Sequence, residues 1–284
     1  MSPGNDKLEP WKWDNSRANE QRGPLRMSTT ATASNLGSEI STSTKASEPP
    51  KRPIPRTKEP FGGAIAMAIL AILVTALGFW RTFFAQLGNV DFAHMLHGAT
   101  STGWLVLVLV QATLIRTRDH KWHRILGWTS IPIFTVLIVT SWHMMALMMA
   151  PTNQLPFELG KFFLYSDLTA LPLLVFTYVA AIVKRKDRNV HSRLVSITLL
   201  AGLLPAAARM FNRVFTGMEG LIFSMHPTYL LVLGVLGAAI ISDWKNNRLR
   251  WPFPFAFIWI TICYATIFPA SKSEWMSVVG HFIA

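Results

Sequence analysis

Four ionisable residues stand inside long apolar runs of this sequence: His97, His143, Asp167 and His226. Counted from the ends of their runs at about 1.5 Å per helical residue, all four lie roughly 6 to 9 Å below the same membrane surface. An ionisable side chain within a membrane segment is costly, so it faces the bundle interior or a cavity and by default marks a functional site. The matched depth therefore predicts one polar layer built by four different helices.

The residue types in this layer suit the binding of heme or a metal ion. Neutral imidazoles ligate iron, zinc or copper, and a carboxylate can hold one ring N–H so that the other nitrogen binds. His94 precedes His97 by one turn and shares its helix face. We therefore expect a cofactor-binding layer of His94, His97, His143, His226 and Asp167, in which His97, His143 and His226 ligate a metal. Hydrogen bonding that only packs the helices is one alternative, and a substrate or proton path is another.

A second set of histidines lies nearer the opposite surface, in a motif that recurs at a constant offset of 68 residues. Arg116, Arg118, Asp119 and His123 match Lys184, Lys186, Asp187 and His191. One interpretation is that each Asp caps a helix N-terminus and contacts the His four residues later. The other is a duplicated two-helix hairpin, which would bring His123 and His191 together as a cofactor-binding pair.

The elements that position these residues are apolar segments. The 284 residues are 51% hydrophobic and 15% charged, whereas soluble domains carry about a quarter charged residues. Seven stretches approach or exceed the roughly 20 residues needed to cross a bilayer: 61–80, 93–115, 125–149, 161–183, 191–212, 221–242 and 252–270. We predict an all-α, polytopic membrane helix bundle of about seven transmembrane helices, with the lipid bilayer as its surroundings.

The net charge of +12 has a topological meaning once the basic residues are placed between the segments. Sixteen Lys and Arg residues lie in 51–58, 116–124, 184–193 and 245–250, all on one side. The other side has five: Arg81, Lys161, Arg209, Arg213 and Lys272. The positive-inside rule then places the N-terminus in the cytoplasm and the C-terminus outside. This distribution also argues against a nucleic-acid partner, because the charges form no single patch.

The chain divides into three parts by composition. Residues 1–60 are polar, hold seven of the fifteen acidic residues and are rich in Ser, Thr and Pro, so we expect a disordered cytoplasmic tail. Residues 61–270 form the transmembrane domain, and 271–284 a short external tail. A single cysteine, Cys263, excludes an internal disulfide and an iron–sulfur cluster held by this chain alone.

Residues 61 to about 250 resemble an uncharacterised family of multi-pass bacterial membrane proteins. The resemblance is carried by His94, His97, Gly98, Trp104, Gln111, His123, Arg124, Leu126, Gly127, Asp167, His191, Arg193, Leu194, Pro205 and Arg209. It implies a bacterial cytoplasmic (inner) membrane and about seven helices, and it implies no activity.

Two looser similarities imply different functions. Membrane b-type cytochromes clamp heme between histidines of separate helices, and here an outer set is matched by an inner set of His120, His123 and His191. That similarity implies heme b, or alternatively a zinc or copper ion, in electron transfer with a quinone or redox-protein partner.

The second similarity is to seven-span zinc hydrolases acting on lipid, which use three His, an Asp and a Ser. The last segment lacks the HxxxH ligand pattern of those enzymes. A non-catalytic subunit of a larger membrane complex is the third hypothesis, and the sequence leaves open whether the protein is an enzyme.

Overall fold

The computed structural model describes residues 63–153, 155–215 and 217–284. Every regular element within these ranges is a helix, which confirms the predicted all-α, multi-pass membrane bundle. The predicted polar tail, residues 1–60, lies outside the described residues.

Six helical segments are long and apolar enough to cross a membrane. They comprise α2 (Phe92–Arg116), α3 (His120–Met149), α4 (Phe157–Val183), α5 with α6 (Arg188–Ala201 and Leu203–Phe211), α7 with α8 (Gly217–Phe223 and Met225–Lys245) and α9 (Pro252–Ser271). The first predicted segment corresponds to α1 (Ala64–Phe79), which has 16 residues. At about 1.5 Å per residue α1 spans about 24 Å, less than the roughly 30 Å hydrocarbon core.

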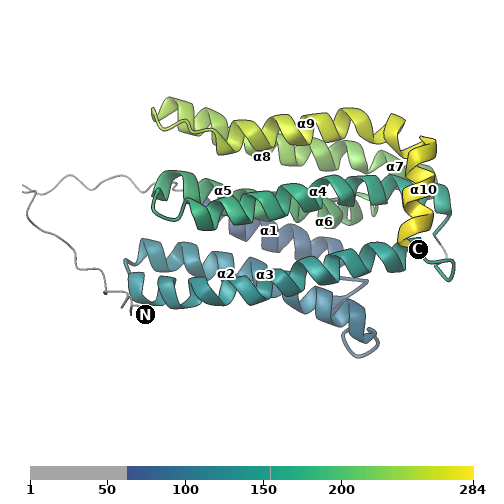
Figure 1. Ribbon diagram of the computed structural model, residues 1–284, viewed down its shortest axis with the longest axis horizontal. Helices are drawn as coiled ribbons and strands as arrows, with labels where there is room; N and C mark the ends of the chain where they lie inside the picture. Colours follow the sequence, from purple (N-terminus) through teal and green to yellow (C-terminus); the bar gives the residue numbers. More distant parts are fainter. Residues whose placement is uncertain (1–62, 154, 216) are drawn as a thin grey trace, which may run out of the picture. The chain divides into compact units, whose positions relative to one another are not determined.

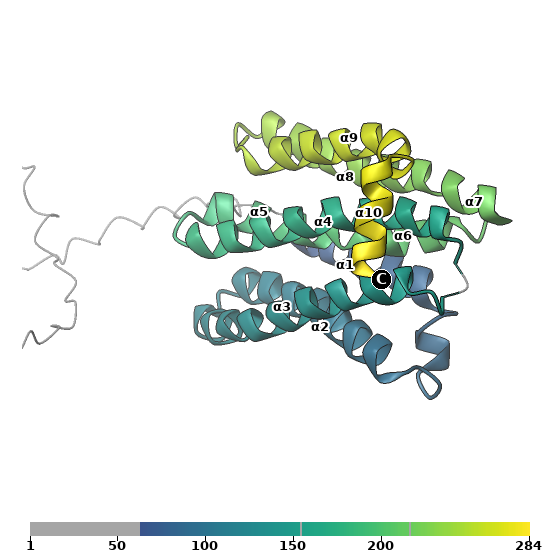
Figure 2. The same ribbon diagram turned by 45° about the vertical axis from the view of Figure 1, so that its right-hand side comes forward.

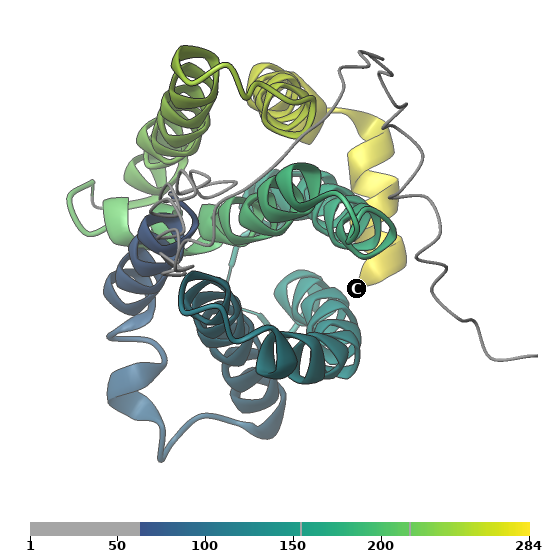
Figure 3. The same cartoon turned by 90° about the vertical axis from the view of Figure 1, so that its left-hand side faces the viewer.

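The long helices run alongside one another in pairs. The α4–α5 pair lies between the α2–α3 pair and the α8–α9 pair (Figures 1 and 3). Helices α1 and α6 pack together at the side of these pairs. Helix α1 contacts both α2 and α6, and α4 contacts α3, α5 and α9.

An aromatic cluster holds the middle of the bundle together. The rings of Trp104 in α2, Phe134 in α3 and Tyr178 in α4 lie 3.8 to 5.3 Å apart between centroids. The Tyr178 hydroxyl lies 2.9 Å from the Ser130 hydroxyl, and Trp104 Nε1 donates to Thr198 Oγ1 in α5 at 3.3 Å. Because the polar ends of these aromatic side chains are paired, the cluster can be buried without leaving an unsatisfied donor.

The fifth predicted segment is interrupted at Gly202, between α5 and α6. Pro205 explains the position of this break, since proline has no N–H to donate to the carbonyl of Ala201, and its ring crowds that carbonyl. The following helix is short and ends with Arg209 in its last turn. A discontinuous helix thus delivers the basic residue of this segment to the outer half of the bundle.

Both copies of the repeated motif cap a helix, as the first interpretation predicts. The Asp119 carboxylate accepts from the Trp122 N–H at 3.2 Å, and Asp187 accepts from the N–H groups of Asn189 and Val190 at 3.0 and 3.1 Å. The expected contact between the side chains of Asp187 and His191 is not formed. Instead, His191 Nδ1 lies 2.8 Å from the Ala181 carbonyl oxygen. The duplication of the two hairpins stays a prediction.

Charged and aromatic residues mark the two ends of the bundle. The basic clusters of 116–124, 184–193 and 245–250 lie at the turns α2–α3, α4–α5 and α8–α9, which share one end (Figure 1). Tryptophans with exposed side chains lie near both ends: Trp122, Trp244 and Trp251 at the basic end, and Trp80, Trp142 and Trp275 at the other. Tryptophan belts of this kind are typical of the two membrane–water interfaces. The orientation of the bundle in its membrane remains a prediction from the basic residues.

The predicted external tail folds as an eighth apolar element, α10 (Glu274–Ile283). It lies across the long helices rather than along them (Figures 1 and 2) and contacts α3 and α4. The buried Lys161 ammonium in α4 donates to Ser277 Oγ at 2.8 Å and pairs with Glu158 at 2.8 Å, and the rings of Phe157 and His281 stack. These contacts hold α10 over the outer end of the bundle.

Candidate functional site in the outer half of the bundle

His97 lies on the second turn of α2 and faces α3. Its Nδ1 lies 3.2 Å from the Thr140 hydroxyl, and its Nε2 lies 3.4 Å from the Ser101 hydroxyl one turn along α2. The Thr140 hydroxyl donates its hydrogen to the Leu137 carbonyl, so it accepts from Nδ1–H of His97, and Nε2 then accepts from the Ser101 hydroxyl. At the adjacent Gly98, a Cβ atom would collide with the ring of Phe83, which explains why a glycine follows His97.

Asp167 in α4 and Arg209 in α6 lie close enough for their charges to interact, and the charge of Arg209 also acts on His97. We call these three residues the outer cluster. The Arg209 guanidinium lies 4.7 Å from the centre of the Phe79 ring and donates to the Pro205 carbonyl at 3.1 Å. Among the described residues, none donates a hydrogen bond to the half-buried Asp167 carboxylate or forms a direct ion pair with it. Arg209 is exposed and Asp167 is half-buried, so the outer cluster keeps unused donors and acceptors that a ligand can reach.

Small residues set the position of Arg209. A Cβ atom at Gly78 of α1 would collide with the Ala206 carbonyl oxygen, so the backbones of α1 and α6 approach closely only because Gly78 has no side chain. Ala206, Ala207 and Ala208 are all buried. This close packing leaves Arg209, one turn after Pro205, to extend from α6 across the end of α1.

A buried tyrosine lies beside the outer cluster and was not indicated by its residue type. Tyr229 of α8 is fully buried, its hydroxyl lies 3.2 Å from the Ser166 hydroxyl, and it interacts electrostatically with Asp167. Its ring stacks on that of Tyr264 at 5.1 Å. A tyrosine in an apolar segment is an ordinary residue of a membrane helix. Only the nearness of Asp167 in the folded protein indicates a role for Tyr229.

His94 has a carboxylate partner from its own helix end, and this partner is Asp91. Their side chains lie 2.6 Å apart, with 55% and 63% of the two side chains exposed. Asp91 also caps α2, and the N–H of His94, followed by its ring, holds the pKa of Asp91 below its ordinary value. Since Nδ1 of His94 is held, Nε2 is the nitrogen left to bind a ligand. The i,i+3 spacing of Asp91 and His94 is a signal that could have found this pair.

The other outer histidines lie apart from the outer cluster. His143 is exposed on α3, while His226 on α8 places Nδ1 2.7 Å from the Tyr264 hydroxyl and stacks on Phe268. Within the described part of the chain, no group of three or more His, Cys, Asp or Glu residues lies together as a metal would require. Among the described residues, His97, His143 and His226 therefore do not form one three-ligand group, and a bound cofactor or a zinc hydrolase stays a prediction.

The inner histidines do lie near each other. His123 at the start of α3 and His191 at the start of α5 are close enough to interact electrostatically, and His120 also acts on His123. Both His123 and His191 are half-buried.

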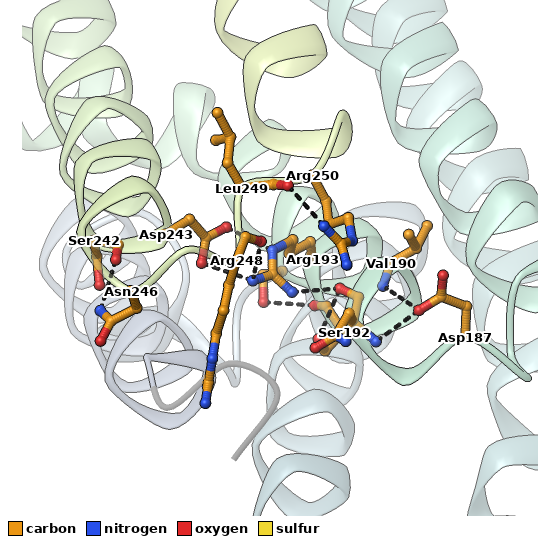
Figure 4. A network of polar contacts seen from close by, with 12 residues as sticks. Asp187, Val190, Ser192, Arg193, Ser242, Asp243, Asn246, Arg248, Leu249 and Arg250 are labelled. Carbon is orange, nitrogen blue, oxygen red and sulfur yellow. Dashed lines mark hydrogen bonds and ion pairs between the residues drawn. The ribbon is translucent and has the colours of Figure 1, made fainter. Parts of the chain in front are cut away.

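A buried ion pair at the same end is not predicted from the sequence, where Arg193 is one of the basic residues that indicate orientation. Figure 4 shows Arg193 of α5 and Asp243 of α8 pointing toward one another. Arg193 Nε and a terminal nitrogen donate to the two Asp243 oxygens at 2.6 and 2.7 Å, and its other terminal nitrogen donates to the Asn189 carbonyl at 2.6 Å. The Arg248 carbonyl accepts a further bond at 3.2 Å. Asp243, an acid at the end of an apolar segment, was the signal in the sequence that could have indicated this ion pair.

Comparison of the chain with protein-family models, with curated proteins and with solved structures finds no match. The resemblance to a bacterial membrane family therefore stays a prediction from its motifs.

Proposed function

We propose that this integral membrane protein transfers electrons together with protons, and that the outer cluster binds a small redox substrate of the quinone class. The observation that carries the proposal is the Asp167 carboxylate, which lies inside a membrane helix without a hydrogen-bond partner among the described residues. A carboxylate that only supported the fold would be expected to have its oxygens paired. An unpaired one is suited to exchanging a proton or a hydrogen bond with a ligand.

The three residues of the outer cluster have complementary roles in this proposal. Arg209 has five N–H groups in a fixed fork, one of which reaches the Pro205 carbonyl, so others can donate to a ligand oxygen that carries negative charge. Asp167 supplies or accepts a proton. His97, between the Ser101 and Thr140 hydroxyls, passes that proton along the chain of polar groups.

Heme b, or a zinc or copper ion in its place, would supply the electron-transfer or Lewis-acid chemistry. Individual histidines fit such a group: His94 and His226 each have Nδ1 held by an oxygen partner, Asp91 and Tyr264, and this leaves Nε2 for ligation. The described residues contain no group of three or more His, Cys, Asp or Glu side chains that could hold a metal ion. We therefore assign no shared metal position to the outer histidines and restrict the proposal to single ligation, with His94 as the better oriented candidate.

Quinone binding tests the substrate part of the proposal. Titration of the detergent-purified chain with a short-chain ubiquinone, followed by tryptophan fluorescence, should give saturable binding. Asp167→Asn and Arg209→Gln should each weaken the affinity at least about tenfold, since a hydrogen bond to a charged group contributes about 1.5 to 3 kcal/mol. Glu274→Gln is the matched control, because Glu274 is an exposed acid on α10. Equal affinity in all variants would show that the outer cluster does not bind this substrate.

Absorption spectra of the same preparation, oxidised and dithionite-reduced, test the cofactor part. A Soret band with reduced α and β bands, lost in His94→Ala and kept in His281→Ala, would identify heme ligated by His94. A colourless, metal-free protein that copurifies with partners would instead favour the non-catalytic subunit.

A further inference from the structure

Three unpartnered polar atoms gather at one place near the basic end of the bundle. Among the described residues, four buried side-chain nitrogen or oxygen atoms lack a hydrogen-bond partner, and three of them are Gln111 Nε2, Gln111 Oε1 and His123 Nδ1. Buried polar groups in proteins are nearly always paired. A group of three unpaired atoms therefore indicates that something beyond the protein atoms satisfies them.

The geometry at His123 leaves a specific ring nitrogen available. Nδ1 of His123 is buried and has no hydrogen-bond partner among the described residues. In the neutral imidazole that carries its hydrogen on Nε2, Nδ1 has a lone pair that can bind a metal ion. The Gln111 amide lies against the same face of α3, since Gln111 Nε2 is the atom nearest to a Cβ placed on Gly127, one turn after His123.

His191 leaves the other ring nitrogen, Nε2, available. Its Nδ1 lies 2.8 Å from the Ala181 carbonyl oxygen, a contact that requires Nδ1 to carry the hydrogen, so the lone pair is on Nε2. The two rings are near enough for their charges to interact. The His191 ring is thus oriented by a backbone carbonyl and keeps Nε2 for another ligand, which is the outer-shell pattern of metal-binding histidines.

We propose that Nδ1 of His123 and Nε2 of His191 bind one transition-metal ion, zinc(II) or copper(II), with the Gln111 amide oxygen as a third ligand or as acceptor for a metal-bound water. The donor set is uncharged and rich in imidazole, which suits zinc or copper and is a poor match for magnesium or calcium. The bound ion joins the start of α3 to the start of α5, and so ties the two repeated motifs together. This site is independent of the outer cluster, and its failure would leave the proposed function untouched.

The test uses the full chain in detergent, with any affinity tag removed, equilibrated with zinc(II) or copper(II) and then freed of excess metal. Elemental analysis should find about one ion per chain, the occupancy of a single site. His123→Ala and His191→Ala should each lose it, while His120→Ala, which removes an exposed neighbouring histidine, should keep it. Metal should also raise the Tm of the wild-type protein and leave the Tm of both ligand variants unchanged.

A second measurement keeps the proposal testable if the alanine variants fold poorly. Electron paramagnetic resonance of the copper-loaded wild type should show hyperfine coupling to two imidazole nitrogens, and the milder variant His191→Gln should reduce it to one. Retention of no metal by the wild type, equal retention in all variants, or coupling to a single nitrogen in the wild type would each overturn the site. In that event water would be the partner of the three atoms.

Discussion

The two ends of the bundle each contain an arginine and an aspartate from different helices, and they differ in how completely these are paired. At the basic end Arg193 is fully buried and bonded to both oxygens of Asp243 and to two carbonyls. At the opposite end Arg209 and Asp167 interact only by the electrostatic effect of one charge on the other, and the Asp167 carboxylate has no hydrogen bond within the described part of the chain. Residue type alone therefore does not distinguish a fully bonded pair from one that keeps unused donors and acceptors, whereas the number of satisfied bonds does.

The largest effect is expected from breaking the fully bonded pair of Arg193 and Asp243. Asp243→Ala or Arg193→Ala should lower the free energy of unfolding by about 3 to 5 kcal/mol, because either change leaves a buried charge without its partner. Unfolding in mixed micelles with increasing SDS measures this loss. The double variant Arg193→Met/Asp243→Leu should recover much of it, and a loss below about 1 kcal/mol in the single variants would show that the pair is not a structural one.

Substitution in the pair of Asp167 and Arg209 should instead lower ligand affinity and leave stability almost unchanged. Asp167→Asn should change the free energy of unfolding by less than about 1 kcal/mol, because few native bonds are lost, while quinone affinity falls at least about tenfold. Parallel unfolding and binding titrations on one preparation separate the two effects. If Asp167→Asn destabilised the protein as strongly as Asp243→Ala, the contrast between the two ends would be wrong.

A change in the helix break should act on the outer end alone. Pro205→Ala restores the N–H that can donate to the Ala201 carbonyl, so α5 and α6 can join into one helix and Arg209 shifts. We expect a several-fold loss of quinone affinity with the stability contributed by Arg193 and Asp243 unchanged. Proline at another interior site, Pro172→Ala in α4, serves as a control that leaves Arg209 in place.

The smallest effect is expected at Asp91, which lies outside the membrane segments. Its pKa is lowered in the folded protein, foremost by the N–H of His94, so its stabilising contribution is present above the carboxyl's unfolded pKa of about 4 and is lost as the pH falls through the lower folded value. Asp91→Asn should therefore be slightly less stable than wild type at pH 6, and the difference should shrink toward pH 3. Unfolding titrations across this range check it, and a constant difference would assign the effect to capping rather than to charge.

Much of the fold could be predicted because membrane helices are local features. Apolar length located the segments to within a few residues at most ends, and the cap positions Asp119 and Asp187 followed from their place before apolar runs. The break at Gly202 and the helix α10 were not predicted, since a proline in an apolar run can also be tolerated, as Pro132 and Pro172 are, and a short amphipathic helix gains its stability from the surface it covers.

The candidate site was predicted only in part. Position along a helix can be counted in a sequence, and His97 and Asp167, which were predicted at one depth, both feel the charge of Arg209. The nearness of His123 to His191 was left open by the sequence as one of two interpretations. The direction of each side chain around its helix axis could not be counted, and for that reason His143 and His226 were expected in a ligand set that the described residues do not form.

The sequence by itself determined the class of the protein, the membrane segments, the helix caps and the segregation of basic residues to one end, because each depends on composition or on neighbours within a few residues. Only the tertiary structure decided which polar groups of different helices come together: Asp243 bonds to Arg193 across 50 residues, and Asp167 lies near Arg209 without a direct bond. Those meetings depend on how the helices rotate and pack against one another. That packing is set by the fit of many side chains at once, such as the close approach of Gly78 to Ala206.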